Sequence, residues 1–394
     1  MALAGLRVLD IATMAAAPWA ATYLAELGAD VIKVEAPVVG DHQRRWGTPK
    51  NGEGLFWKSI GRNKRSVTLS LSKPDGAALF KRLVAEADVV IENFRPGTLE
   101  RWGLGYEVLR AINPRLILLR VTGFGQNGPY APRPGFGTLA ESLTGFAGLT
   151  GQPDGPPTLP NMPLADGVAG VMGAFAVMVA LYWRDARGGA GQMIDLSLCE
   201  PLLRLIEPSL LDYDQFGIVR GRIGNRSDHV APRNTYQCGD GRWLAISASA
   251  QSIFERLMLA IGRPELRTDP RFAVNSARVE NVNALDAIIG SWMAQRDRDA
   301  ALAELQRAEV AAAPVYDVAE IFADPHFQAR GSMVSVEDPA LGPMRLVDVA
   351  ARFSETPGQV RHTGPALGSS NAEVYGALGV TEEELEALRR EGVI

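Results

Sequence analysis

The sequence predicts an α/β protein whose N-terminal half forms a parallel sheet with helices on both faces. Two observations support this fold. The chain opens with a β-like run, a helical run that ends at Gly28 and a second β-like run, which is the pattern of a βαβ unit. The alternation continues to about residue 122, and strands that alternate with helices in this way form doubly wound sheets.

The individual elements follow from apolar runs and their spacing. The predicted strands are 6–12, 30–35, 64–71, 87–93 and 115–122. The predicted helices that join them are 17–29, 74–86 and a segment near 98–112. Pro74 suits the first position of its helix, because the N–H that proline lacks would have no partner there.

Two loops rich in glycine and proline end this alternation. Residues 123–137 contain five glycines and three prolines, and residues 151–160 have a similar composition. Such a density predicts long functional loops rather than helices or strands. A helix is expected between the loops, near 138–148, and the second loop leads into Asp166.

An uncharged run of 17 residues, Gly167–Trp183, follows Asp166. Its length lies at the lower edge of what is needed to cross a bilayer. Five of its first eight residues are Gly or Ala, and the chain has no second span of this kind. We therefore interpret the run as a buried core helix.

A second region follows the polar stretch 220–235, which is typical of a linker. Residues 241–262 have strand-then-helix character, helices continue to about 309, and 313–318 are strand-like. Thr381 and Glu384 have the spacing of a capping box and start a last helix. A length of 394 residues exceeds the usual size of one hydrophobic core, so two domains are expected.

Composition excludes several classes of protein. Lysine and arginine number 40 against 45 acidic residues, and the net charge of −5 argues against a protein that wraps nucleic acid. Cys199 and Cys238 lie far apart and the four histidines are scattered, so neither a metal site nor a disulfide is expected. Arg7 and Asp10 interrupt the apolar N-terminus, which fails as a signal peptide. We expect a cytoplasmic protein that binds no membrane.

Familiar catalytic motifs fail on their context. GFGQNG at 123–128 matches G-x-G-x-x-G after a strand, but the PYAPRPG that follows cannot start the helix that would hold a pyrophosphate. No G-x-S-x-G elbow is present, and no histidine is spaced to orient a cysteine. Carboxylates are left as the reactive groups. Asp166 either caps a helix or attacks, without a base, a target that is already activated, such as a thioester or a phosphate.

Basic residues gather where a phosphorylated carrier could bind. They lie in 41–46 and 61–65 and at Arg95 and Arg101, and solvated surface charge is the alternative for each. Asn93–Gly97 directly follows a predicted strand, and open α/β sheets bind ligands at the carboxyl ends of their strands.

Ordered blocks along nearly the whole chain resemble the class III CoA-transferases, the family of formyl-CoA transferase and carnitine CoA-transferase. The resemblance implies a Rossmann-like large domain over 1–219, completed by about 325–394. It implies a linker and a smaller α/β domain over 220–324, and an interlocked homodimer. The blocks are LAGLRVLDIA near the start, LGADVIKVE (27–35), NKRSVTLSL (63–71), ADVVIENFRPG (87–97), GYEVLRAINPRLI (105–117), GFGQNGPYAPRPG (123–135) and LADGVAG (164–170).

The catalytic aspartate of this family matches Asp166. The resemblance implies that its carboxylate attacks an acyl-CoA thioester to give a mixed anhydride, which the CoA thiolate converts to an aspartyl-CoA thioester. An acceptor carboxylic acid then takes the CoA, so the CoA thioester is a substrate and no cofactor is bound permanently. The residues fit this role, because a helix start favours an anion and Gly167 and Gly170 let backbone N–H groups approach an oxyanion.

The family's CoA-contacting segments match turns that follow predicted strands. Arg101 and Arg133 are the expected phosphate partners, because a guanidinium makes two parallel bonds to phosphate oxygens. Ala15, Ala36 and Ser72 depart from the Gln, basic residue and Lys of formyl-CoA transferase, and 246–254 lacks the glycines of the family's flap. The matched positions are Met14, Ala15, Ala16, Leu69, Ser70, Leu71, Ser72, Asn93, Phe94, Arg95, Arg101, Arg133, Pro134, Gly135 and Phe136.

Two other functions are compatible with this fold. The 2-methylacyl-CoA racemases pair the same aspartate with a histidine, but Phe136 stands at that position and cannot carry a proton. A non-catalytic acyl-CoA-binding protein is the second alternative. Residues 135–160 look closer to branches that handle dicarboxylates, such as succinyl-CoA with malate, citramalate, mesaconate or glutarate. Arg45, Arg62 and Arg226 are candidates for binding a second substrate carboxylate.

Overall fold

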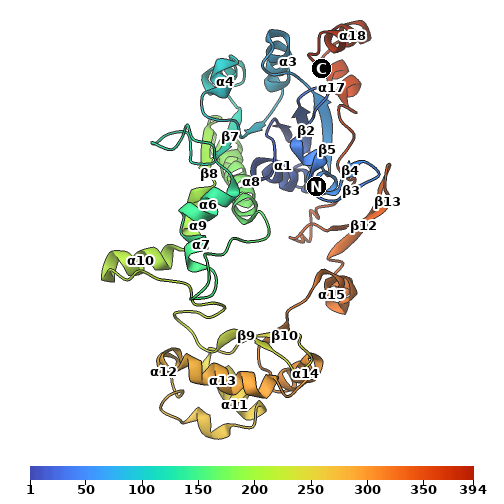
Figure 1. The fold of residues 1–394 in the computed structure, drawn as a ribbon. Coiled ribbons are helices and arrows are strands. Elements are labelled where there is room, and N and C mark those ends of the chain that lie inside the picture. Colours follow the sequence, from blue (N-terminus) through green and yellow to red (C-terminus); the bar gives the residue numbers. More distant parts are fainter. The chain divides into compact units, whose positions relative to one another are not determined.

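The computed structural model describes residues 1–394 and contains a six-stranded parallel sheet (Figure 1). The strands lie in the order β5-β2-β1-β6-β7-β8, and all neighbours are parallel. The order changes direction between β1 and β6, so the carboxyl ends of these two strands form the switch point where open α/β sheets bind ligands. The strands are β1 (Arg7–Asp10), β2 (Asp30–Glu35), β5 (Lys64–Thr68), β6 (Val89–Glu92), β7 (Ile117–Thr122) and β8 (Met193–Ser197).

All predicted strands of this half are present, and β8 is an addition. Its residues alternate between exposed and half-buried positions, because β8 is an edge strand. It therefore lacks the continuous apolar run that identifies the central strands β6 and β7, which are buried throughout.

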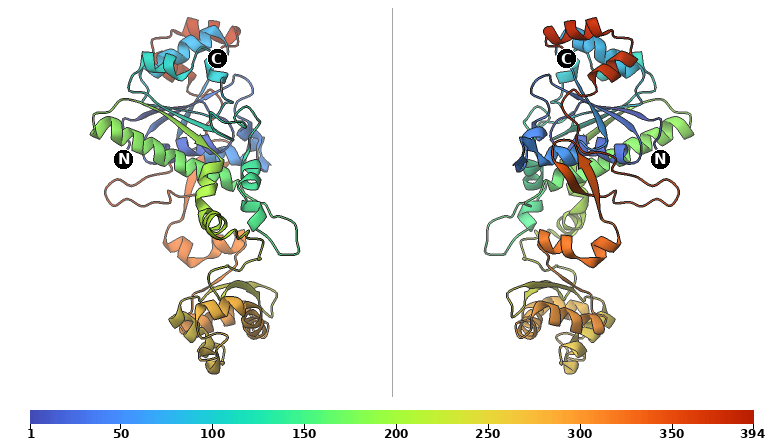
Figure 2. Two further views of the ribbon diagram at one scale, coloured as in Figure 1. Left: turned by 90° about the vertical axis from the view of Figure 1, so that its left-hand side faces the viewer. Right: turned by 90° about the vertical axis from the view of Figure 1, so that its right-hand side faces the viewer.

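Helices cover both faces of the sheet, as predicted. On one face, α1 (Ala16–Glu26) and α8 (Leu164–Ala186) share a core with side chains such as Val8 and Leu119. On the other face, α3 (Pro74–Ala85), α17 (Asn371–Ala377) and α18 (Glu382–Arg390) pack on side chains such as Leu9 and Leu118. Figure 2 shows the sheet between α8 and this second group of helices in both views.

Two predicted helices are each divided at a glycine with positive φ. The segment near 98–112 forms α4 (Thr98–Arg101) and α5 (Tyr106–Ile112), with Gly103 at φ 69° between them. The segment near 138–148 forms α6 (Gly137–Leu143) and α7 (Phe146–Leu149), with Gly145 at φ 87° between them. A positive φ favours glycine and ends an α-helix, whereas the apolar spacing continues across both breaks.

The other elements beside the large sheet are short. The capping box predicted for α18 is confirmed, because the N–H of Glu384 donates to Thr381 Oγ1 over 3.2 Å and the N–H of Thr381 donates to Glu384 Oε2 over 2.8 Å. The remaining elements are a 3₁₀-helix (His42–Arg45), the pair β3 (Pro49–Lys50) and β4 (Glu53–Gly54), α2 (Leu55–Ile60), α9 (Cys199–Leu205), α10 (Glu207–Phe216), and the hairpin β12 (Met333–Asp338) and β13 (Gly342–Val347).

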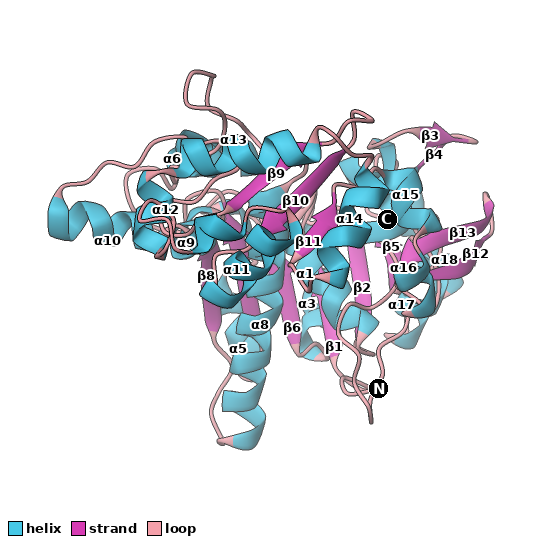
Figure 3. Ribbon diagram, turned by 90° about the horizontal axis from the view of Figure 1, so that it is seen from below, coloured by secondary structure: helices cyan, strands magenta, loops and turns pink.

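The chain divides into two compact units. The first comprises 1–146, 159–216 and 327–394, and the second comprises 147–158 and 217–326. The second unit has a core of its own and a three-stranded antiparallel sheet in the order β11-β10-β9 (Figure 3). Its elements are β9 (Arg233–Gln237), β10 (Trp243–Ser247), α11 (Gln251–Ala260), a 3₁₀-helix (Pro264–Arg267), α12 (Asn275–Glu280), α13 (Val282–Met293), α14 (Arg298–Arg307), β11 (Ala312–Pro314) and α15 (Val318–Ala323), and α16 (Pro325–Ala329) follows at its boundary.

Helix α8 has one buried and one exposed apolar face. Its small residues pack against α1 and the sheet, whereas Val171, Phe175 and Tyr182 are 56%, 62% and 62% exposed. The interpretation of the uncharged run as a buried core helix therefore holds for the inner face alone and is wrong for the outer face, because apolar side chains surround the helix while the sheet covers only one side. By length and composition α8 is the one helix that could cross a membrane, and 39% of its most apolar window is buried.

A fully buried ionic cluster lies among β1, β2 and β5. Asp10 accepts from Lys64 Nζ over 2.9 Å and pairs with Lys33 Nζ over 3.4 Å. Lys64 Nζ also donates to the carbonyl of Pro18 over 2.7 Å, and Lys33 pairs with Asp41 over 3.0 Å. The cluster thereby links three strands to the start of α1 and to the segment that follows β2.

We predict that Lys64→Ala lowers the free energy of unfolding of the first unit by about 3–5 kcal/mol, because it removes the nearer of the two cations that pair with the buried Asp10. Urea denaturation followed by circular dichroism measures the change. Lys50→Ala is the control, since Lys50 is exposed on β3, and it should change the value by less than about 0.5 kcal/mol. Equal midpoints for the two variants would contradict this account of the cluster.

Candidate active site

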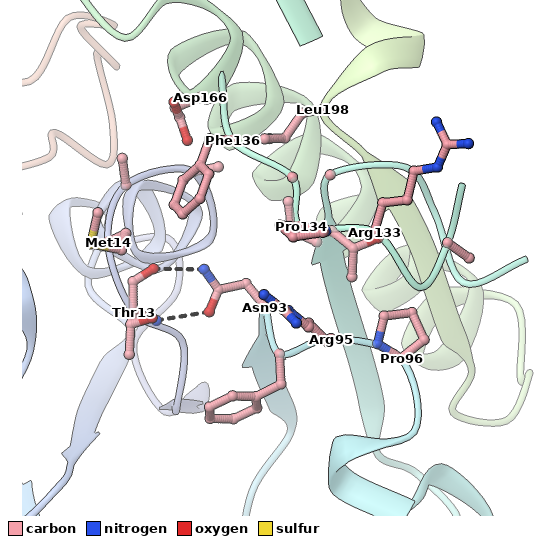
Figure 4. A pocket seen from close by; sticks show the side chains of 18 residues that line it. Thr13, Met14, Asn93, Arg95, Pro96, Arg133, Pro134, Phe136, Asp166 and Leu198 are labelled. Carbon is pink, nitrogen blue, oxygen red and sulfur yellow. Dashed lines mark hydrogen bonds between the residues drawn. The ribbon is translucent and has the colours of Figure 1, made fainter. Parts of the chain in front are cut away.

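A cavity of about 200 Å³ opens at the switch point of the large sheet (Figure 4). Its walls are the turn after β1, the turn after β6, the end of β7 and the glycine-rich loop that follows, together with the first turn of α8. The lining residues are Thr13, Met14, Ala15, Ala16, Asn93, Phe94, Arg95, Pro96, Val121, Thr122, Gly123, Ala131, Arg133, Pro134, Gly135, Phe136, Asp166 and Leu198.

Side chains from the neighbouring turns hold the turn after β1 in shape. Asn93 accepts from the N–H of Thr13 over 2.8 Å and donates to the carbonyl of Thr13 over 2.6 Å, as Figure 4 shows. The next residue, Met14, has a positive φ of 67°, and its N–H donates to Asp41 Oδ1 over 3.2 Å. Burial raises the pKa of Asp41, but Lys33 and the N–H groups of Gln43 and Met14 outweigh this effect and leave the pKa below its usual value. Asp41 is therefore an anion at neutral pH that fixes this strained turn.

A second buried carboxylate holds the turn after β6. Glu92 accepts from the N–H of Phe94 over 2.6 Å and from Arg120 Nε over 2.6 Å. Burial raises the pKa of Glu92 to about 7 against the opposing effect of Arg120. Arg120 also donates to Glu100 on α4 over 2.8 Å, so the turn is fixed at both ends.

The basic side chains of the cavity have no acidic partners in the protein. Arg133 lies over the ring of Tyr130, 3.8 Å from its centroid, and neither Arg133 nor Arg95 forms an ion pair. Their charges are therefore available to an anionic ligand, and planar guanidinium groups suit phosphate or carboxylate.

Asp166 is the only acidic residue that lines the cavity. It is the third residue of α8, and the backbone N–H groups of Ala16 and of Asp166 itself act to lower its pKa. Burial, and after it the negative charge of Glu141, outweigh these N–H groups and raise the pKa to about 6. The sequence argument that a helix start favours the anion is thus outweighed by desolvation. At pH 7 the carboxylate is still about nine-tenths ionised.

Gly137 leaves the space that the Asp166 carboxylate fills. A Cβ atom on Gly137 would lie 2.3 Å from Asp166 Oδ2. Gly123 and Gly135 meet similarly, because a Cβ on either would lie 2.5 Å from the Cα of the other. The glycines of the loop 123–137 therefore permit close backbone approach around the cavity. The density of glycines in the sequence did not show which of them make these contacts.

The two glycines that follow Asp166 differ in their surroundings. A Cβ on Gly170 would lie 3.0 Å from the carbonyl of Ala16 and 2.9 Å from Trp19 Cβ, so this glycine brings α8 against α1. Gly167 meets nothing within 4 Å. The expected role of Gly170 in approaching an oxyanion is therefore replaced by a role in helix packing.

The structure brings most of the predicted site residues together. Asp166, Met14, Ala15, Ala16, Asn93, Phe94, Arg95, Arg133, Pro134, Gly135 and Phe136 all line the cavity. Leu69, Leu71, Ser70, Ser72 and Arg101 do not. Leu69 and Leu71 are core side chains, the N–H of Ser70 donates to the carbonyl of Val393, Ser72 is exposed, and Arg101 donates to Thr98 Oγ1. Their contact with CoA stays a prediction.

None of the three arginines suggested for a second substrate carboxylate lines the cavity. Arg62 is paired with Glu26, and Arg226 is paired with Asp286 over 2.7 Å, so neither is a free cation. Arg45 donates to the carbonyl of Val39 over 2.7 Å. Sequence reasoning did not single out Thr13, Gly137 or Glu141, because their roles depend on contacts between distant segments.

We predict that Gly170→Ala destabilises the first unit by about 1–3 kcal/mol, because the added methyl group meets the backbone of α1. Gly167→Ala, three residues earlier on the same helix, should instead stabilise it by about 1 kcal/mol, since alanine favours a helix and space is free. Thermal unfolding of the two variants measures the contrast. Equal effects would show that α1 and α8 do not meet at Gly170.

Comparison with known proteins identifies the family. The family model described as CoA-transferase family III matches residues 3–371. A succinyl-CoA–D-citramalate CoA-transferase of Chloroflexus aurantiacus is 45% identical over 98% of this chain and 97% of its own length. The β subunit of a succinyl-CoA–L-malate CoA-transferase of the same organism is 44% identical over 100% and 98%.

A solved structure agrees with this result. The crystal structure of a CAIB/BAIF family protein from Brucella suis is 38% identical and superposes with a TM-score of 0.84, over 95% of this chain and 99% of that one. The resemblance inferred from the sequence blocks and the predicted α/β fold are both confirmed. The chain belongs to CoA-transferase family III.

Proposed function

We propose that this enzyme transfers CoA from an acyl-CoA thioester to a free carboxylic acid, with Asp166 as the nucleophile. The observation that carries the proposal is the position of Asp166, the single carboxylate in a cavity that also contains two unpaired arginines. The cavity lies at the switch point of the large sheet, and the chain belongs to a family of CoA-transferases. Similar enzymes act on succinyl-CoA with citramalate or malate, so we propose dicarboxylic substrates of this size.

The transfer proceeds in four steps in which carboxylates and the CoA thiolate exchange places, and none of them needs a proton donor. The Asp166 carboxylate attacks the thioester carbon, the C–S bond breaks, and the electron pair leaves on the CoA sulfur as a thiolate. The thiolate then attacks the aspartyl carbon of the mixed anhydride, which releases the donor acid and gives an aspartyl-CoA thioester. The acceptor carboxylate attacks that thioester, the C–S bond breaks, and the CoA thiolate leaves a second mixed anhydride behind. The thiolate finally attacks the acceptor's acyl carbon in this anhydride, which gives the new CoA thioester and releases the Asp166 carboxylate.

The cavity supplies the groups that this chemistry requires. Asp166 is mainly ionised at neutral pH, because its pKa is about 6. The N–H of Ala16 forms a hydrogen bond with the carboxylate, which supports a role for it in stabilising an oxyanion. Arg95 and Arg133 offer positive charge to the phosphates of CoA or to a substrate carboxylate.

The two alternatives fit the cavity less well. A racemase needs two residues that exchange protons with the same carbon, but no histidine, cysteine or lysine lines the cavity, and Phe136 occupies the position expected for the histidine. A binding protein without turnover would not need a desolvated carboxylate in the same cavity as the two unpaired arginines.

The exposed apolar surface supports the proposed homodimer. The outer face of α8 is apolar. No residue of α10 is buried, and its apolar Leu211 and Phe216 are 56% and 75% exposed. Large exposed apolar surfaces mark protein interfaces, and we propose a second copy of the chain as the partner. A cytoplasmic location and the absence of a permanently bound cofactor belong to the same proposal.

We predict that Asp166→Asn lowers CoA exchange at least about 1,000-fold while acyl-CoA still binds, because the amide cannot act as the nucleophile. Labelled CoA donors incubated with a panel of dicarboxylic acids measure exchange and identify the substrates. Hydroxylamine trapping followed by peptide mass analysis should mark Asp166 in the wild type.

Asp75→Asn is the matched control, since Asp75 is an exposed aspartate in the first turn of α3, and exchange should be unchanged. Exchange by Asp166→Asn at the wild-type rate would eliminate Asp166 as the nucleophile. Exchange of the α-proton with deuterated water, without CoA transfer, would favour the racemase.

We predict that Gly137→Ala lowers kcat about 10- to 100-fold, because its methyl group displaces the Asp166 carboxylate from the position it now occupies. The KM for the acyl-CoA should change less, since Gly137 is not among the residues that line the cavity. Gly148→Ala on α7 is the control, because a Cβ there meets nothing within 4 Å. A kcat equal to that of the control would show that Asp166 does not depend on this space.

A further inference from the structure

Another buried carboxylate, Glu141, lies close to the proposed nucleophile and takes no part in the transfer steps above. It lies on α6 and is 3% exposed. Its Oε1 accepts from the N–H of Ala165 over 3.1 Å, and it forms no other hydrogen bond and no ion pair. A buried carboxylate with a single donor and no cation is costly to a folded protein.

The geometry places this carboxylate beside Asp166. Glu141 lies one helical turn after Gly137, so both face the first turn of α8. Gly137 lies against the Asp166 carboxylate, because a Cβ atom added to Gly137 would be 2.3 Å from Asp166 Oδ2. Glu141 accepts a hydrogen bond from the N–H of Ala165, the residue before Asp166. The face of α6 therefore presents a negative charge to the helix turn that carries the nucleophile.

Nothing packed around this turn neutralises that charge. Helix α1 carries one charged residue, Glu26, at its far end, and Arg120 on β7 is paired with Glu92 and Glu100. Apart from Asp166, the charged residues of α8 itself, Arg184 and Asp185, lie in its last turn. The remaining titratable groups on α8, on elements packed against it or lining the cavity are Tyr23, Tyr182, Asp195, Cys199, Glu200, Arg204, Arg95 and Arg133, and none of them pairs with Glu141 or Asp166.

We propose that Glu141 is a positioning residue whose negative charge destabilises the free carboxylate of Asp166 relative to its acylated form. The proposal rests on the proposed function. When Asp166 attacks the thioester, its negative charge passes to the departing CoA thiolate, and the aspartyl group becomes neutral beside Glu141. Repulsion between two adjacent carboxylates is thereby relieved as the new C–O bond forms. The pKa of Asp166 agrees, since the charge of Glu141 follows burial among the causes that raise it.

The alternative role for Glu141 is to accept the hydrogen bond from Ala165 and nothing more. A glutamine would fill that role equally well, because its amide oxygen is an acceptor of the same shape. Glu141→Gln therefore separates the charge from the hydrogen bond.

The experiment measures the pH dependence of kcat/KM for CoA exchange. In the wild type the rate should fall below about pH 6, as Asp166 becomes protonated. In Glu141→Gln this acid limb should move down by about half to one pH unit, because one cause of the raised pKa is gone. The single-turnover rate of aspartyl-CoA formation above the limb should fall several-fold, because the carboxylate is less basic.

Two controls make the result decisive. Glu200→Gln removes an exposed negative charge on the neighbouring helix α9 and should leave the limb in place. Glu141→Asp keeps the charge and should keep the limb within about 0.3 pH unit of the wild type. Glu141→Asp also tests the proposal if Glu141→Gln does not fold. An acid limb that moved down although the negative charge is retained would overturn the proposal.

An unchanged limb in a folded, active Glu141→Gln enzyme would also overturn it and leave Glu141 with the hydrogen bond alone. A wild-type protein without any CoA exchange would instead refute the proposed function.

Discussion

The close approach of α8 to α1 is the constraint on which the site depends. Small residues allow it, because Gly170 meets the backbone of Ala16 and Gly173 would place a Cβ 3.3 Å from Ala20 Cβ. This contact sets the first turn of α8 against the turn after β1, at the switch point of the sheet. A larger side chain at the contact would separate the two helices and move Asp166 away from the N–H of Ala16.

The buried charges serve this arrangement at some cost to stability. Asp41, Glu92 and Lys33 are removed from water, and buried ion pairs seldom repay their desolvation in full. Two of these charges bind backbone N–H groups of turns that line the cavity, at Met14 and Phe94. These buried charges are thus better explained by the fixed shape of the turns than by added stability, because unfixed turns would leave the groups that line the cavity mobile.

Local sequence signals predicted much of this structure, and contacts between distant segments explain the rest. The buried central strands and the capping box of α18 are readable because their signals lie within a few residues. Asp166 was singled out from its family block, and it lines the cavity. By contrast, the role of Gly137 depends on a residue 29 positions away, and that of Glu141 on the N–H of Ala165. The exposed face of α8 was missed because apolar composition does not show which side a sheet covers.

The balance of forces on Asp166 suits its proposed role as a nucleophile that works without a base. A carboxylate in water has a low pKa and is a weak nucleophile, whereas a fully desolvated one is protonated at neutral pH and cannot attack. Burial and Glu141 raise the pKa to about 6, and the N–H groups of Ala16 and Asp166 limit the rise. At pH 7 about nine-tenths of the molecules hold the ion, yet it is about a hundred times more basic than an exposed aspartate. A larger rise would leave most of the carboxylate protonated at neutral pH, so the N–H groups of Ala16 and Asp166, which limit the rise, support the proposed reactivity against the burial they oppose.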